Sequence, residues 1–189
     1  MTTTFKSLLI ISAFALTAAS CGKVDDPVKP EPVPTPAKSE MHLKFNNRVG
    51  SDPLALETSQ YTNESGELFS VSVFNYYISN IKFIKADNSE YAEPESYHLV
   101  RHNVSGSEHF HVADVPAGEY KAVKFTIGVD EARNTSGAQN GALAPENGMF
   151  WTWNTGYIRA KLEGKYAVDK EFKQDVGGLK GEMRGVRTA

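Results

Sequence analysis

Residues 69–84 decide the fold, and they read Phe-Ser-Val-Ser-Val-Phe-Asn-Tyr-Tyr-Ile-Ser-Asn-Ile-Lys-Phe-Ile. In the first part of this stretch apolar and serine side chains alternate: Phe69, Val71 and Val73 against Ser70 and Ser72. A period of two is typical of a half-buried β-strand. The second part, residues 76–84, is apolar on both faces, which predicts a central strand covered on both sides.

The same alternation recurs along the chain in four other segments. They are Met41, Leu43 and Phe45; Phe110 and Val112; Val123, Phe125, Ile127 and Val129; and Ile158, Ala160 and Leu162. Short polar or Pro/Gly turns separate such runs at residues 63–66, 87–89 and 116–118. No stretch shows a helical stripe of useful length. We therefore predict one all-β domain over residues 41–189, an antiparallel β-sandwich of the Ig-like or Greek-key type.

The region between residues 130 and 148 breaks the alternation. It is rich in Asn, Gly and Ala and shows no periodicity, which predicts a long loop that is either functional or mobile. Asp130, Glu131 and Asn134 stand at its start, and their oxygens could bind calcium or another hard cation. The alternative is an ordinary solvated loop.

The first twenty residues have the order of a secretory signal. Lys6 precedes an apolar run at residues 8–16 and small residues at 17–20. The run is shorter than the roughly 20 residues that span a bilayer. Residues 18–21, Ala-Ala-Ser-Cys, look like a bacterial lipobox, so we predict cleavage after residue 20 and a covalent lipid on Cys21. The alternative is a plain signal peptide, but Cys21 is the only cysteine and has no disulfide partner.

Residues 21–40 are predicted to form a tether that carries the lipid. Five prolines fall in this stretch, which favours extended polyproline II over a packed core. We expect membrane attachment through the lipid anchor, at the outer membrane, on its periplasmic side or at the cell surface. The chain has 20 Lys and Arg against 23 Asp and Glu, and removal of residues 1–20 takes only Lys6, leaving a net charge near −4. Without a basic patch, nucleic acid is not an expected partner.

Histidines are the candidate metal ligands. His109 and His111 fall on one face of a predicted strand, roughly 6.5–7 Å apart along it, a spacing at which two imidazoles can chelate one ion. His42 lies on the polar face of its own strand and is the third candidate. The alternative for all three is an exposed polar side chain. His98 and His102 are given no role.

An aromatic segment at residues 148–157 is the second candidate site, and it reads Gly-Met-Phe-Trp-Thr-Trp-Asn-Thr-Gly-Tyr. If the segment is extended, Trp151 and Trp153 share a face. Together with Met149 and Tyr157 they could border a metal or expose a tryptophan to oxidation. The alternative is a core anchor, because aromatic residues dominate burial in small sheets and Met commonly fills gaps.

Several strings, taken in order and spacing, resemble the MbnP family of copper-binding periplasmic or surface proteins, which are found in methanotrophs and as lipoproteins of Bacteroidetes. The strings are Phe45 with residues 49–51 and 54–56, residues 74–81, residues 115–120, residues 125–130 and residues 148–157. The resemblance implies a β-sandwich that binds copper. It also implies that a dihaem peroxidase-like partner oxidises a tryptophan, Trp151 or Trp153, to kynurenine, whose new carbonyl and amine join histidines in the metal site.

The chain departs from the family pattern at both motif histidines. Relatives often read Phe-Asp-His where this chain has Asn47 as the third residue, and His-Ile-Gly-Gly where it begins with Asp175. Oxygen ligands suit copper less well than imidazole. Relatives also continue into a final strand where this chain reads Arg187-Thr188-Ala189, so we expect the sandwich to lack that strand and to leave a sheet edge exposed.

Two functions are therefore open. The first is a copper-binding, lipid-anchored envelope protein involved in metal handling. The second is a metal-free cell-surface module that binds a glycan or a protein on the same scaffold. An enzyme is not expected, because the sequence has no nucleophile elbow, no phosphate-binding loop and no dinucleotide fingerprint.

Overall fold

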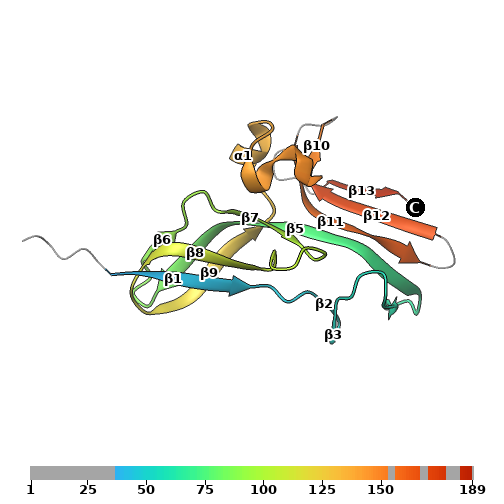
Figure 1. The fold of residues 1–189 in the computed structure, drawn as a ribbon, viewed down its shortest axis with the longest axis horizontal. Helices are drawn as coiled ribbons and strands as arrows, with labels where there is room; N and C mark the ends of the chain where they lie inside the picture. The colour runs from blue at the N-terminus through green and yellow to red at the C-terminus, as the bar shows by residue number, and fades with distance from the viewer. Residues whose placement is uncertain (1–36, 153–155, 167–169, 178–183, 189) are drawn as a thin grey trace, which may run out of the picture. The chain divides into compact units, whose positions relative to one another are not determined.

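The centre of the fold is one long strand, β5 (Leu68–Lys85), 18 residues in length. The computed structural model describes residues 37–152, 156–166, 170–177 and 184–188, which lie within one compact unit, Pro36–Ala189. The alternating stretch 69–73 and the stretch 76–84, apolar on both faces, differ in their hydrophobic pattern. Both are nevertheless successive parts of this single strand (Figure 1). Every other strand of the main sheet is placed directly or indirectly by pairing with β5.

Both edges of β5 carry antiparallel partners. Along one edge run β11 (Gly156–Tyr166) and β9 (Tyr120–Ile127), and along the other run β4 (Tyr61–Thr62), β7 (Tyr97–Arg101) and β6 (Glu90–Ala92). Outside β11 lie β12 (Lys170–Gly177) and then β13 (Arg184–Thr188), while β10 (Phe150–Trp151) pairs with the start of β11. Among the described residues β13 ends the sheet on that side; the expectation that a further strand is missing stays a prediction.

A second layer packs on one face of the main sheet. It consists of β1 (Lys38–Lys44) and β8 (His109–Pro116), paired antiparallel. Between the layers lies a first core of buried residues: Tyr76, Ile78, Ile81, Phe83, Val100, Val112 and Val115. Met41, Leu43 and Phe110 of the second layer pack against this core. A short hairpin of β2 (Arg48–Val49) and β3 (Asp52–Pro53) follows β1. The predicted all-β antiparallel sandwich is confirmed.

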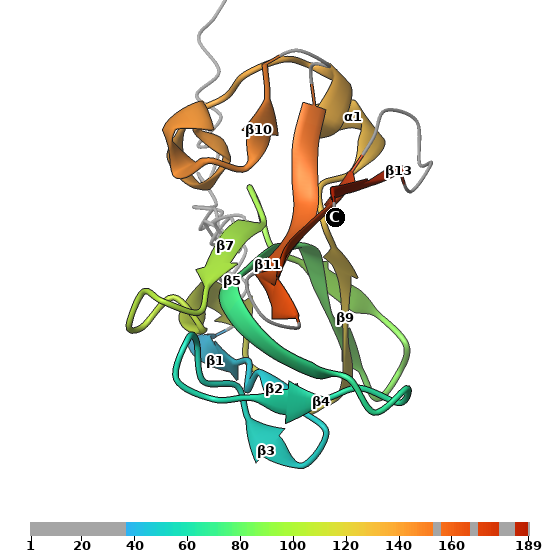
Figure 2. The ribbon, with the colours of Figure 1, turned by 90° about the vertical axis from the view of Figure 1, so that its right-hand side faces the viewer.

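The opposite face of the main sheet is covered by residues 128–152. This segment contains the helix α1 (Glu131–Thr135) and two short 3-10 helices, η1 (Gly141–Leu143) and η2 (Pro145–Asn147). Its buried residues form a second core with the sheet: Tyr77, Val129, Leu143, Met149, Trp151, Tyr157 and Ile158. Figure 2 shows α1 and β10 at the opposite end of the view from β1. The expected long loop is therefore an ordered cover, which explains why β5 is apolar on both faces.

The cover is held by polar groups at its start. Asp130 caps α1 by accepting a hydrogen bond from the Arg133 backbone N–H. Asn134 is fully buried, and its side-chain oxygen accepts from the Tyr157 backbone N–H at 2.7 Å. Asn80 donates to the Asp130 carboxylate at 3.2 Å. The Asp130 and Asn134 oxygens, two of the three considered above as ligands for a hard cation, are thus engaged in holding the cover on the sheet. None of the helices in the described ranges is long and apolar enough to cross a membrane.

One expectation about burial is wrong. The alternation in β9 predicts a half-buried strand whose apolar face is covered, yet Val123, Phe125 and Ile127 are 39%, 41% and 62% exposed. The reason is the width of the second layer, which in the described residues has only the two strands β1 and β8. They cover β5 and reach only part of β9: the Tyr120 hydroxyl donates to the Pro116 carbonyl oxygen of β8 at 2.5 Å, and the ring of Phe45, just after β1, lies 5.5 Å from that of Phe125 between centroids.

A glycine of β11, Gly164, lies against the backbone of β5. A Cβ at Gly164 would run into the Ser70 carbonyl oxygen and would lie 2.7 Å from the Phe172 ring. We expect Gly164→Ala to lower the free energy of unfolding by about 1–3 kcal/mol, the range for overpacking a well-packed interior. Lys165→Ala, an exposed neighbour, should change it by less than about 0.5 kcal/mol. Urea unfolding followed by circular dichroism measures both, and equal effects would contradict the close approach.

Candidate functional site

Three imidazoles gather on the outer face of the β1–β8 sheet. His42 lies directly opposite His111, and His109 is the next outward-facing residue of β8. His42 Nδ1 is 3.3 Å from His109 Nε2. The His42 and His111 ring centroids are 4.1 Å apart, and those of His109 and His111 4.9 Å. Three ring nitrogens, one from each histidine, lie within 4.8 Å of one another. We call these three residues the imidazole cluster.

The register of the strand pair creates the cluster. Alternate residues of β1 and β8 pack inward, with Leu43 opposite Phe110 and Met41 opposite Val112. Because side chains alternate between faces, anchoring these residues inside turns the residues between them to solvent. A slip of one residue would bury the imidazoles and expose the apolar set. The hydrophobic core therefore fixes the position of the cluster.

A carboxylate completes the group. The pairing of β1 with β8 shifts register between Ser39 and Met41, and Asp114 in the facing strand has φ +60°. Such a bulge re-aims side chains and increases the local twist. Here it accompanies Glu40, whose Oε1 lies 2.8 Å from His111 Nδ1 and whose Oε2 lies 3.9 Å from His42 Nε2.

The donor set fits a borderline transition metal. Imidazole nitrogen suits copper, zinc and nickel, and three of them on one rigid strand pair can hold a single ion. The three rings are exposed, so a metal could reach them directly from solvent. The copper implied by the sequence resemblance therefore finds suitable ligands here, in unmodified side chains.

The other two histidines are structural partners. The His98 ring stacks on Phe110, with centroids 3.9 Å apart, and its Nε2 faces the Glu93 carboxylate at 2.9 Å. His102 is enclosed by polar groups: its Nε2 lies 2.8 Å from the Leu54 carbonyl oxygen, and its Nδ1 faces Glu108. Neither ring belongs to the imidazole cluster.

Asn47, which takes the place of a family motif histidine, belongs to the network around His102. Its Nδ2 lies 3.2 Å from His102 Nδ1, and it accepts a hydrogen bond from the Tyr76 hydroxyl at 2.9 Å. Burial, together with the Glu108 charge, raises the pKa of Tyr76 to about 12. Asn47 therefore has a structural role on the side of the main sheet that faces β1 and β8.

The aromatic residues of the second candidate site lie inside the cover. Trp151 is 7% exposed, and Met149 and Tyr157 are fully buried. A Cβ at Gly177 would lie 2.8 Å from the Trp151 indole, so the indole rests on the glycine backbone of β12. The described geometry is that of a packed core. Trp153, like Cys21, lies outside the described residues.

Asp175, at the other motif position, lies beside this indole. Trp151 donates a hydrogen bond to its carboxylate, and Asp175 pairs across the ladder with Lys161. Burial raises the pKa of Asp175 above its ordinary value, while the positive charge of Lys161 acts in the opposite direction.

The structure does not bring the imidazole cluster and Trp151 together. The neighbouring residues Tyr76 and Tyr77 point to opposite faces of β5, and they belong to the two different cores. The cluster lies beyond the first core, on the outside of β1 and β8, whereas Trp151 lies in the second. An ion held by the cluster would therefore have no contact with this indole.

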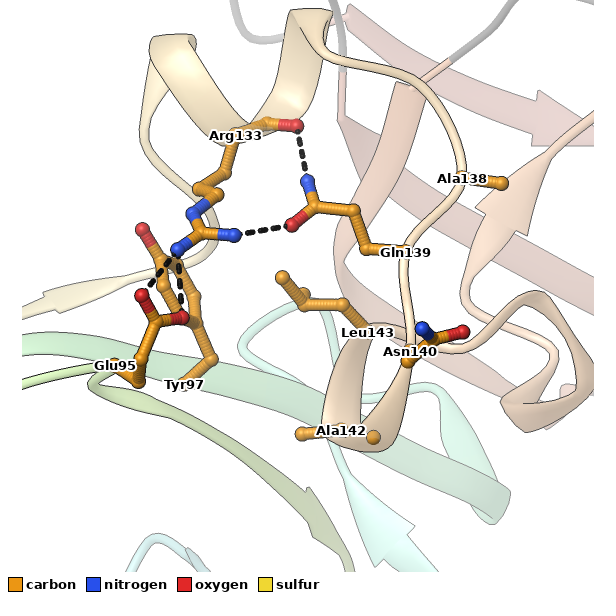
Figure 3. A pocket seen from close by; sticks show the side chains of 9 residues that line it. Glu95, Tyr97, Arg133, Ala138, Gln139, Asn140, Ala142 and Leu143 are labelled. Atoms are coloured by element: carbon orange, nitrogen blue, oxygen red, sulfur yellow. Dashed lines mark hydrogen bonds and ion pairs between the residues drawn. The ribbon is translucent and has the colours of Figure 1, made fainter.

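A groove opens beside the cover (Figure 3). Its cavity volume is about 500 Å³. The Arg133 guanidinium lies at its edge, donating to both oxygens of Glu95 at 2.6 Å and to Gln139 at 2.6 Å, and it lies over the Tyr97 ring at 5.3 Å. Its lining also includes the small or apolar side chains of Ala138, Ala142 and Leu143. A metal-free binding module would have its natural ligand site here.

Sequence reasoning did not identify Glu40 or this groove. Glu40 could have been found, because it stands two positions before His42 and so shares its strand face. The groove could not, because Glu95 and Arg133 are 38 residues apart and no local pattern links them.

Comparisons with known proteins agree on one family. The sequence profile of the MbnP family matches residues 38–189. Among solved structures, MbnP from Methylosinus trichosporium is similar, with a TM-score of 0.58 at 10% identity. The match covers 74% of this chain and 62% of that chain, so this chain spans less than two thirds of the length of its structural neighbour. No curated protein matches.

The partly buried carboxyl of Asp175, beside Trp151, leads to a pH prediction. Its raised pKa means that the folded state disfavours the ionised form, so Asp175 lowers stability increasingly as pH rises through its pKa. Asp175→Asn keeps an oxygen for the indole and removes the charge. We expect it to raise the midpoint of thermal unfolding at about pH 7 and to have less effect at about pH 4, because the raised pKa leaves more of the wild-type carboxyl protonated there than an ordinary aspartate would be.

Glu171→Gln is the matched control for this experiment, since Glu171 is an exposed acid on the same strand. Its effect on the unfolding midpoint should be small at both pH values. An Asp175→Asn variant that is destabilised at neutral pH, or equally affected at both, would show that the carboxylate is stabilised in its ionised form.

Proposed function

This chain belongs to the MbnP family, and from that premise we propose that it is a copper-binding protein of the bacterial cell envelope that takes part in metal handling. A lipid on Cys21 and the proline-rich residues 21–40 would hold the domain near the outer membrane. In this role the protein would bind and present an ion rather than transform a substrate.

The observation that carries the proposal is the imidazole cluster. Three ring nitrogens from two paired strands lie within 4.8 Å of one another, near enough to share one ion. The strands that carry them are anchored to the core by Leu43, Phe110 and Val112, so the ligands are held by the scaffold before any metal arrives. Pre-organised ligands lose little conformational entropy on binding.

Copper at this place needs no modified tryptophan. All three donors are ordinary imidazoles, and the motif positions Asn47 and Asp175 supply none. The Trp151 indole is buried and hydrogen-bonded to Asp175, which shields it from an enzyme partner. A dihaem peroxidase-like partner acting on Trp151 or Trp153 would therefore add to metal binding by the cluster without being required for it.

Removal of a ligand tests the proposal. We expect His109→Ala to weaken Cu(II) binding by more than about 100-fold, because loss of even an outer partner of a metal ligand costs about 10–100-fold. Lys44→Ala is the matched control, an exposed side chain on the same sheet face without a ring nitrogen, and it should bind at least as tightly as wild type. Titration of the mature chain against a calibrated chelator gives the affinities, and equal affinities for His109→Ala and wild type would refute the site.

The proposed lipid anchor is tested by replacing Cys21, the only cysteine of the chain and so the only thiol that can be acylated. In Cys21→Ser no thiol remains for acylation, so we expect the chain to leave the membrane fraction and to lack the acyl mass that the native protein should show by intact mass spectrometry. Ser20→Thr, a change beside the cysteine, should stay with the membranes. A wild-type mass without acyl groups would exclude the lipid anchor while leaving the metal proposal intact.

A further inference from the structure

We propose that Glu40 is a positioning residue that makes the imidazole cluster selective for Cu(II) over Cu(I). The inference rests on the proposed function, since it requires that copper binds to the cluster. To the proposed function it adds which oxidation state of copper is bound and which residue favours that state.

The first step is the choice of donor atom on His111. Glu40 Oε1 lies 2.8 Å from His111 Nδ1, which is hydrogen-bond distance, and an ionised carboxylate can only accept. His111 must then carry its proton on Nδ1, and this leaves the lone pair on Nε2 for a metal. A carboxylate behind a metal-binding histidine fixes the ring orientation and increases the basicity of the nitrogen that binds the metal.

The second step is the charge next to the ion. Both carboxylate oxygens of Glu40 face the cluster, one toward His111 and the other 3.9 Å from His42 Nε2. A negative charge at such a distance stabilises a doubly charged ion more than a singly charged one.

Few other charges compete with Glu40 at this face. Lys44 pairs across the strands with His109 and opposes the effect at the other end of the cluster. Lys38 and Asp114 form an ion pair with each other at 3.0 Å, so together they add little net field. Because Glu40 is half exposed, solvent and salt weaken its field but do not reverse its sign.

The experiment compares two affinities in each variant of the mature chain. Cu(II) affinity is measured by competition with a calibrated chelator in air, and Cu(I) affinity by competition with bicinchoninate without oxygen. We expect Glu40→Gln to weaken Cu(II) binding by about 10–100-fold and Cu(I) binding by less than about 10-fold. Glu131→Gln, an exposed acid on α1 at the other face of the main sheet, should change neither.

Glu40→Asp guards against a purely structural effect. It keeps the charge and shortens the reach, so its ratio of Cu(II) to Cu(I) affinity should fall between those of wild type and Glu40→Gln. Equal weakening of both oxidation states in Glu40→Gln, or no weakening of either, would overturn the inference. If wild type binds copper and His109→Ala does not, the proposed function survives that outcome; if wild type binds no copper, both proposals fail.

Discussion

The structure depends on the burial of β5 on both faces. Tyr76 and Tyr77 follow one another in the chain, yet one packs under β1 and β8 and the other under the cover of residues 128–152. Neither face could be left open, because each carries large apolar side chains whose exposure to water costs about 1.5–3 kcal/mol per residue. The main sheet is consequently a partition, and groups attached to its two sides cannot meet.

That partition determines what a metal can touch. The imidazole cluster lies on the outer face of β1 and β8, on one side of the main sheet, and the Trp151 indole lies on the other side. They therefore do not form one site. The positions where the family pattern expects histidines are divided in the same way, with Asn47 in the network below Tyr76 and Asp175 against Trp151. Asn47 accepts a hydrogen bond from the Tyr76 hydroxyl. Asp175 accepts one from the indole, but its partial burial disfavours the ionised carboxylate. Neither side chain offers an imidazole nitrogen to a metal.

Sequence reasoning succeeded where the pattern is local. The alternation of Met41, Leu43 and Phe45 predicted both the strand and its exposed face, which placed His42 on the outside. The same rule set His109 and His111 on one face of a second strand, but pairing between strands 67 residues apart is not written in either segment, so the meeting of the three rings could not be derived. For β9 the local rule gave the wrong burial, because alternation reports which residues share a face and not whether another layer covers it. The cover at residues 128–152 was missed for a related reason: its order comes from capping and from the buried Asn134, which carry no periodicity.

An exposed cluster has consequences that a buried site would not. Its exposed ligands are rehydrated when the ion leaves, instead of remaining as unpaired polar groups in a dry interior, and water or a donor from another molecule can approach the ion from the open side. Exchange at such a site is limited by the strength of the metal–nitrogen bonds rather than by opening of the protein. With the proposed proline-rich tether, a strand pair that holds three imidazoles in the open would be suited to passing an ion on. The negative charge of Glu40 would then act on both affinity and exchange, since it would stabilise the more highly charged ion while bound and attract it from solution.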